Sequence, residues 1–160
     1  MICILSDTHE NLTAIDAALK VIREVGPDQV LHCGDIISPP TLKRFAGLPL
    51  RAVFGNNDGE RPGLLRTARE CGFGEMAEAL DLEIGGKSFH IYHGTDPARL
   101  EGAILSQHYD YVCTGHTHAV RDERCGRTRV INPGALFMVR PWTMALLDLA
   151  ADTFEIVEIE

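Results

Sequence analysis

The first half of the chain alternates short apolar runs with amphipathic stretches. Ile2 to Leu5 is a continuous apolar run, which is typical of a buried strand. After Asn11, which can cap a helix, apolar residues recur at helical spacing until Gly26-Pro27. The same alternation predicts a strand over Gln29 to Cys33, a short helix from Ser38 to Phe45, a strand over Arg51 to Phe54 and a helix over Gly63 to Cys71. This βαβαβ order predicts a parallel sheet with right-handed crossovers.

The second half is richer in paired strands. Strand-like runs on either side of turn sequences predict three hairpins: Leu80 to Ile84 with Ser88 to Tyr92, Val120 to Arg124 with Thr128 to Ile131, and Met144 to Leu149 with Phe154 to Ile159. A helix is expected from Asp96-Pro97 onward, and Tyr111 to Thr114 reads as one more strand. We therefore predict an α/β fold with two stacked mixed β-sheets and helices on the outer faces, a four-layer αββα sandwich.

Length, cysteine usage and charge limit the class of protein. A chain of 160 residues fits one domain over residues 1–160. Five scattered cysteines without a Cys-x-x-Cys pair suit a reducing compartment, and no apolar run approaches the roughly 18 residues of a membrane span. With no recognisable leader either, we expect a cytoplasmic protein without a membrane partner. The net charge of −8, without any basic run, disfavours binding to a long nucleic acid.

Polar clusters stand directly after five of the predicted strands. They are Asp7-Thr8-His9, Gly34-Asp35, Gly55-Asn56-Asn57-Asp58, His93-Gly94 and Gly115-His116-Thr117-His118. In open α/β sheets the ligand crevice lies outside the carboxyl ends of the strands. We therefore expect these clusters to converge on one site.

The clusters carry the side chains that bind divalent metals. In extended backbone, residues two apart point the same way, so Asp7 and His9 can share a metal, as can His116 and His118. Carboxylate, amide oxygen and imidazole suit manganese, iron or zinc, and the absence of thiolates argues against a structural zinc cage. The candidate ligands are Asp7, His9, Asp35, Asn56, His93, His116 and His118. Seven ligands exceed the need of one ion and would fill two neighbouring sites with one bridging carboxylate.

In this order the motifs resemble those of the calcineurin-like metallophosphoesterases, particularly their small, single-domain bacterial and archaeal phosphodiesterase branch. Asn132-Pro133-Gly134 also resembles a turn of that branch, with Ala135 in place of the usual serine. The resemblance covers essentially the whole chain. It implies two divalent cations, with manganese expected and iron, zinc and nickel as alternatives. It also implies that Asp7, His9, Asp35 and His118 bind the first cation and Asp35, Asn56, His93 and His116 the second.

The implied activity is hydrolysis of a small phosphodiester by in-line attack of a hydroxide that bridges two cations about 3.5 to 4 Å apart. Two further residues are candidate catalytic residues. The family often has a histidine where Asn57 stands, and an amide can donate a hydrogen bond but cannot supply a proton. Diesters with good leaving groups should then react faster, unless a residue such as His32 helps. Asp58 is expected to orient a histidine ligand, with a cap or a turn as the alternative reading.

Other interpretations remain open beside this one. The retromer subunit of eukaryotes resembles the same fold and uses it as a protein-interaction scaffold, so a catalytically weak scaffold is the main alternative. A metallo-β-lactamase-like hydrolase fails because Ala119-Val120 follow His118 and because the first cluster is left unexplained. His32, His90 and His108 are expected to be structural or surface residues. Substrate specificity is expected from Gly59 to Gly74, and the sequence leaves a homo-oligomer open.

Overall fold

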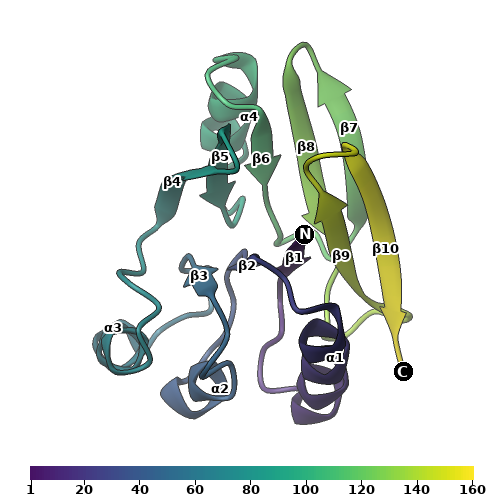
Figure 1. The fold of residues 1–160 in the computed structure, drawn as a ribbon. Helices are drawn as coiled ribbons and strands as arrows, with labels where there is room; N and C mark the ends of the chain where they lie inside the picture. Colours follow the sequence, from purple (N-terminus) through teal and green to yellow (C-terminus); the bar gives the residue numbers. More distant parts are fainter.

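A computed structural model describes residues 1–160 and contains two stacked five-stranded sheets (Figure 1). The first sheet, in the order β10-β9-β1-β2-β3, consists of β1 (Ile2–Leu5), β2 (Gln29–His32), β3 (Leu50–Ala52), β9 (Trp142–Asp148) and β10 (Thr153–Ile159). The second sheet, in the order β4-β5-β6-β8-β7, consists of β4 (Ala79–Ile84), β5 (Lys87–Tyr92), β6 (Tyr111–Cys113), β7 (Val120–Cys125) and β8 (Thr128–Pro133).

Helices form the two outer layers (Figure 1). The helices on the first sheet are α1 (Leu12–Val25), α2 (Pro39–Lys43) and α3 (Arg61–Glu70), and the helix on the second sheet is α4 (Pro97–Leu105). This arrangement confirms the predicted four-layer αββα sandwich. None of the four helices has the length and apolar character needed to cross a membrane.

The apolar runs become strands that are buried on both faces. In β1, Ile2 and Ile4 pack into the core between the two sheets, while Cys3 and Leu5 pack into the core under the helices. Successive side chains of a strand point to opposite faces, so a strand covered on both sides is apolar at every position. A sheet covered on both sides explains the unbroken apolar run that opens the chain.

Helix α1 follows the local signals in its sequence. The side chain of Asn11 accepts a hydrogen bond from the backbone N–H of Ala14, and Gly26 ends the helix in the left-handed conformation. Ile15, Leu19 and Ile22 form the buried face against the first sheet. The predicted cap, helical spacing and stop are therefore confirmed.

Strand direction positions the polar clusters. Strands β1, β2 and β3 are parallel neighbours, and so are β5 and β6 in the second sheet. Each of these five strands runs into one of the polar clusters at its carboxyl end. The polar clusters therefore come together at the carboxyl ends of the strands, as predicted.

Several boundaries differ from those predicted. Helix α3 begins at Arg61, two residues earlier than expected, with a proline in its first turn. Strand β3 ends at Ala52, because Val53 pairs only through an isolated bridge with Ala77. Strand β9 begins at Trp142, two residues early, because β10 continues its pairing as far as Ile159. These shifts change none of the layers.

Candidate metal centre

The two acidic residues of the clusters lie among histidine nitrogens. Asp35 Oδ2 is 3.5 Å from His9 Nε2 and 3.5 Å from His93 Nε2. Asp7 Oδ1 is 3.2 Å from His118 Nε2 and 3.9 Å from His93 Nε2. Both carboxylates therefore lie between imidazoles that come from different strand ends.

The remaining two candidate ligands lie at the exposed side of this cluster. Asn56 Oδ1 is 3.0 Å from His93 Nε2. The ring of His116 meets the ring of His93 edge-on, with 5.2 Å between the ring centroids. The structure thus brings all seven sequence-predicted ligands together, with Asp7, Asp35 and His93 buried at the centre.

The donor set fits a divalent cation. Two groups, Asp7 with His9 and His118, and Asp7 with Asp35 and His93, have ligand atoms within 4.8 Å of one another. Asp7 Oδ1 and His9 Nε2 are buried without a hydrogen-bond partner, which is rare for buried polar atoms. Ligands about 2.0 to 2.2 Å from one ion stand about 3 to 3.5 Å apart, close to the spacing seen here.

Neighbouring groups leave the metal-facing atoms free. Asp7 Oδ2 accepts hydrogen bonds from Ser6 Oγ at 2.5 Å and from the backbone N–H of His116 at 3.0 Å, so only Oδ1 is unpaired. His93 Nδ1 lies 2.7 Å from the carbonyl oxygen of Cys33, to which it donates as an N–H. This bond fixes the tautomer in which Nε2 is a free ligand atom.

The backbone at the site is strained. Five of the seven candidate ligands have positive φ angles: Asp7 at 50°, His9 at 43°, Asp35 at 60°, His116 at 67° and His118 at 57°. Left-handed backbone costs a residue other than glycine roughly 1 to 2 kcal/mol, so it persists only where surrounding bonds hold it. Such strain is concentrated at functional sites. The backbone conformation therefore marks this site independently of the types of side chain that it carries.

Asp58 supplies part of that support. Its Oδ2 accepts hydrogen bonds from the backbone N–H groups of Asp35 at 2.9 Å and Gly55 at 2.7 Å, and its Oδ1 accepts from Ile36 at 2.8 Å and Ile37 at 2.6 Å. No histidine is among its hydrogen-bond partners. The expectation that Asp58 orients an imidazole is therefore replaced by a different role, in which a buried carboxylate holds the loops that carry Asp35 and Asn56.

Asn57 binds the central carboxylate. Its side-chain amide donates to Asp35 Oδ2 at 2.7 Å, and its backbone N–H donates to Asp35 Oδ1 at 2.8 Å. Burial alone would raise the pKa of Asp35, but the bond that His93 Nε2 donates when its ring is protonated and the two bonds from Asn57 outweigh burial and hold the pKa below its usual range. Asp35 is therefore an anion at neutral pH.

His32 cannot take the place of a leaving-group acid. It is fully buried, its Nδ1 accepts the backbone N–H of Gly34 at 3.2 Å, and its Nε2 lies 3.0 Å from Thr8 Oγ1. Burial lowers the pKa of His32 to about 3, so the ring is neutral and has no open path to substrate. His90 pairs with Asp81 and His108 is exposed, in agreement with their expected structural and surface roles.

Sequence reasoning missed the role of Asn132. Its side-chain amide donates to the carbonyl oxygen of Gly115 at 2.8 Å and to Thr117 Oγ1 at 3.1 Å, and its Oδ1 accepts from the backbone N–H of Gly134 at 3.0 Å. Asn132 therefore braces the loop that carries His116 and His118. The available signal was a turn motif directly after an apolar strand, which predicted the turn but not its contact with the site.

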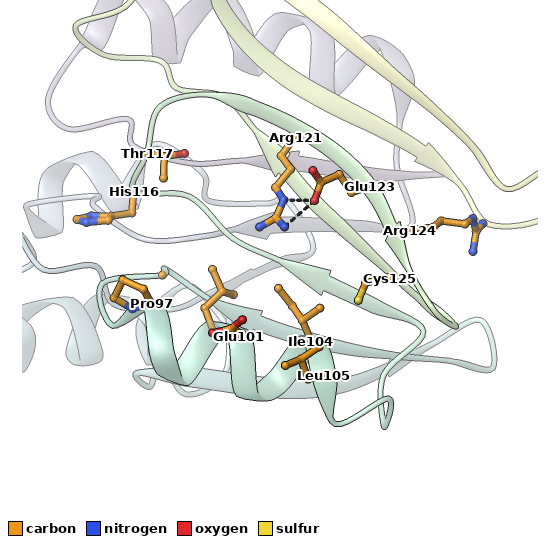
Figure 2. A pocket seen from close by; sticks show the side chains of 12 residues that line it. Pro97, Glu101, Ile104, Leu105, His116, Thr117, Arg121, Glu123, Arg124 and Cys125 are labelled. Atoms are coloured by element: carbon orange, nitrogen blue, oxygen red, sulfur yellow. Dashed lines mark hydrogen bonds and ion pairs between the residues drawn. The ribbon is translucent and has the colours of Figure 1, made fainter.

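Two hollows open beside the cluster. The aromatic hollow, of about 750 Å³, is lined by His9 and Asn57 together with Phe137, Met138, Arg140 and Trp142. The α4–β7 groove, of about 800 Å³, begins at His116 and runs between α4 and β7 (Figure 2). The segment from Gly59 to Gly74 lines neither hollow, because its helix α3 packs into the core of the first sheet. Neither hollow therefore supports the expectation that this segment sets specificity, which stays a prediction.

Comparisons with known proteins agree with this geometry. The family model of the calcineurin-like phosphoesterase superfamily domain matches residues 1–152. A phosphodiesterase of Methanocaldococcus jannaschii is 34% identical over 162 residues and 98% of each chain. The solved structure of an archaeal phosphodiesterase has a TM-score of 0.93 at 32% identity over 99% of both chains. Vps29 of Entamoeba histolytica, solved with zinc, has a TM-score of 0.70 at 19% identity over 99% of both chains, a likeness of fold alone. The chain therefore belongs to the calcineurin-like phosphoesterase superfamily.

Proposed function

We propose that this protein is a cytoplasmic, metal-dependent phosphodiesterase that hydrolyses small phosphate diesters with the help of two divalent cations. One observation carries the proposal. Asp7 Oδ1 and His9 Nε2 are buried, lack hydrogen-bond partners and face other ligand atoms, an arrangement that is costly unless a cation occupies it. The archaeal phosphodiesterase relatives support the reaction class.

Each cation would have four protein ligands. Asp7, His9, Asp35 and His118 would hold the first, and Asp35, Asn56, His93 and His116 the second. The position of Asp35 Oδ2, at 3.5 Å from a histidine of each set, supports its assignment as the bridging ligand. Carboxylate, amide oxygen and imidazole suit manganese, and iron, zinc and nickel are the alternatives to test.

The bound cations would supply positive charge for the phosphoryl oxygens and lower the pKa of a water nucleophile. The chain's own residues do the positioning. Asp58 holds the loop of Asp35, the carbonyl of Cys33 orients His93, and Asn57 keeps the carboxylate of Asp35 in place. No protein nucleophile is needed, because water attacks the phosphorus directly.

The scaffold alternative has weaker support. Vps29 shares the fold, but at 19% identity it says nothing about the activity of this chain. A protein-interaction scaffold has no need of unpaired buried carboxylate and imidazole atoms, which destabilise the fold when no cation is bound. The complete ligand set therefore favours catalysis.

The test is a panel of phosphate mono- and diesters assayed with the chelator-treated protein and with added Mn²⁺, Fe²⁺, Zn²⁺ or Ni²⁺. We expect hydrolysis of diesters only with metal, and a loss of at least about 100-fold in Asp35→Asn. Asp16→Asn is the matched control, because Asp16 is an exposed carboxylate on α1 that pairs with Arg44. Full activity in Asp35→Asn would refute the bridging role, and metal-independent turnover would refute the proposal.

A further inference from the structure

The aromatic hollow contains one stacked pair of rings and one contact between an arginine and a tryptophan. Phe137 stacks on the ring of His9, with 4.3 Å between centroids and 28° between planes. The guanidinium of Arg140 lies over the ring of Trp142, with its central carbon 3.5 Å from the ring centroid. The stacked pair connects the hollow to a candidate metal ligand. The contact between arginine and tryptophan places a flat cation on the wall of the hollow.

Arg140 is a free cation next to a site for an anion. It forms no hydrogen bond or ion pair with another side chain, and it is exposed. Trp142 lies against its guanidinium on one side, and the side chain is otherwise exposed to the hollow and the solvent. Guanidinium groups stack on aromatic planes, and they attract phosphoryl anions by charge. In a chain of net charge −8, an unpaired arginine at this position is suited to binding an anionic ligand.

We propose that the aromatic hollow binds a planar aromatic substituent of the phosphodiester, which stacks on the open face of Arg140 while Trp142 supports the other face. This inference rests on the proposed function, because the diester's phosphoryl group lies at the candidate metal centre. His9 is a candidate ligand and Asn57 binds Asp35, and both line the hollow, so the hollow adjoins the centre and a substituent on the phosphorus would extend toward Arg140. Arg140 and Trp142 are thus residues that determine specificity.

The α4–β7 groove is chemically different. Its walls include the aliphatic side chains of Ile104 and Leu105 (Figure 2). Both of its arginines are paired, Arg121 with Glu123 at 2.6 Å and Arg124 with Asp152. Apart from the imidazole of His116, no aromatic ring lines it. Nothing in this groove selects for a planar group, so the aromatic substituent is assigned to the other hollow.

The test measures binding without turnover. In dibenzylphosphinate a CH₂ group replaces each ester oxygen, so the compound cannot be hydrolysed, and bis(cyclohexylmethyl)phosphinate has the same charge and similar size without a planar ring. With the Mn²⁺-loaded protein, calorimetry should show that dibenzylphosphinate binds about tenfold tighter. Because both probes carry one negative charge, the ratio of their dissociation constants compares a planar with a saturated ring, and its dependence on Arg140 reports stacking.

Variants locate the effect. Arg140→Ala should bring the ratio close to one, and Arg140→Lys should do the same, because lysine keeps the charge but has no flat face. Arg99→Ala is the matched control, since Arg99 lies over Tyr92 at 4.5 Å outside both the hollow and the metal centre, and it should keep the full ratio. Trp142 packs against the core, so Trp142→Phe, expected to keep the preference, accompanies Trp142→Ala, expected to lose it.

The outcomes separate this inference from the proposed function. A wild-type ratio near one, or a ratio unchanged in Arg140→Ala, overturns the inference even if the protein hydrolyses diesters. If the ratio depends on Arg140 but no ester is hydrolysed with any metal, the aromatic hollow stands and the proposed function fails. If neither phosphinate binds, the inference is overturned, and the ester panel alone decides the proposed function.

Discussion

Gly55 shows how closely the candidate ligands are packed at the scale of single residues. A Cβ atom at this position would lie 2.1 Å from Asp35 Oδ1 and 2.5 Å from the backbone nitrogen of Asp35. Contacts this short do not occur in folded proteins, so the carboxylate or the chain would have to move. The absence of a side chain at Gly55 is therefore a condition for the position of the central carboxylate.

Gly55→Ala is expected to lower phosphodiesterase activity at least about 100-fold, because a displacement of about 1 Å at a catalytic group has effects of that size. The measurement is kcat/KM with a diester in saturating metal, together with metal content. Gly59→Ala is the matched control, since a Cβ there meets no atom within 4 Å and the backbone is not left-handed. Equal activity of the two variants would show that the position of Asp35 does not matter.

Asn57 gives a second prediction at this scale. General acid assistance to a leaving group contributes roughly 100-fold to 10,000-fold, and neither Asn57 nor the buried, neutral His32 can supply it. We expect diesters with a nitrophenolate leaving group to react much faster than alkyl diesters of equal size. Asn57→His should narrow that gap by accelerating the alkyl diesters. Equal rates for aryl and alkyl diesters in the wild type would contradict the argument.

At the scale of elements, Asp58 joins the loops that follow β2 and β3. Its two oxygens accept four backbone N–H groups, two of them from Ile36 and Ile37. In Asp58→Asn one acceptor becomes an NH₂ group that faces two N–H donors. Hydrogen bonds to a charged group contribute about 1.5 to 3 kcal/mol each, so the free energy of unfolding should fall by about 3 to 5 kcal/mol.

Chemical denaturation of the metal-free protein measures this effect, so that metal binding does not enter the comparison. Asp16→Asn, at an exposed carboxylate in a surface ion pair, should change the free energy of unfolding by less than about 1 kcal/mol. An equally small change in Asp58→Asn would mean that water replaces the carboxylate, and the loops would then need another source of rigidity.

The order of elements could be predicted because each has a strong local signal. Helix α1 has a cap, helical spacing and a stop glycine, and the buried strands are unbroken apolar runs. Boundaries were less accurate where pairing across the sheet decides them. Strand β9 extends back to Trp142 because of its partner strand, and β3 ends early because only Val53 and its bridge partner continue the pairing. Neither cause is local in sequence.

The types of metal ligand could be predicted from the sequence, but the contacts that hold these ligands in place could not. Aspartate, asparagine and histidine at five strand ends have few other readings, and the structure brings all seven together. The sequence does not indicate that the backbone of Asp35 and His9 is left-handed, because that conformation depends on bonds from distant loops. Arg140 and Trp142 were missed for a similar reason, since they approach His9 only through the return of the chain after β8.

At the scale of the whole molecule, the candidate metal centre joins the two sheets. His9 and Asp35 follow strands of the first sheet, whereas His93 and His118 follow strands of the second. Between these ends the sheets are held by an apolar core that includes Ile4. Apolar packing has no preferred direction, but a shared cation fixes ligands at defined distances. Metal binding should therefore stabilise the packing of one sheet on the other.

Thermal unfolding with and without metal tests this coupling. At a free metal concentration about 100 times the dissociation constant, each site adds about 2.7 kcal/mol, and 1 kcal/mol raises Tm by about 2 to 4 °C in a chain of this size. We expect Mn²⁺ to raise Tm by about 10 °C or more, a chelator to reverse the rise, and elemental analysis to find two equivalents. Asp35→Asn should lose most of the increase, because its carboxylate contacts histidines of both sheets. A folded protein whose Tm does not change with any divalent metal would instead support the scaffold alternative.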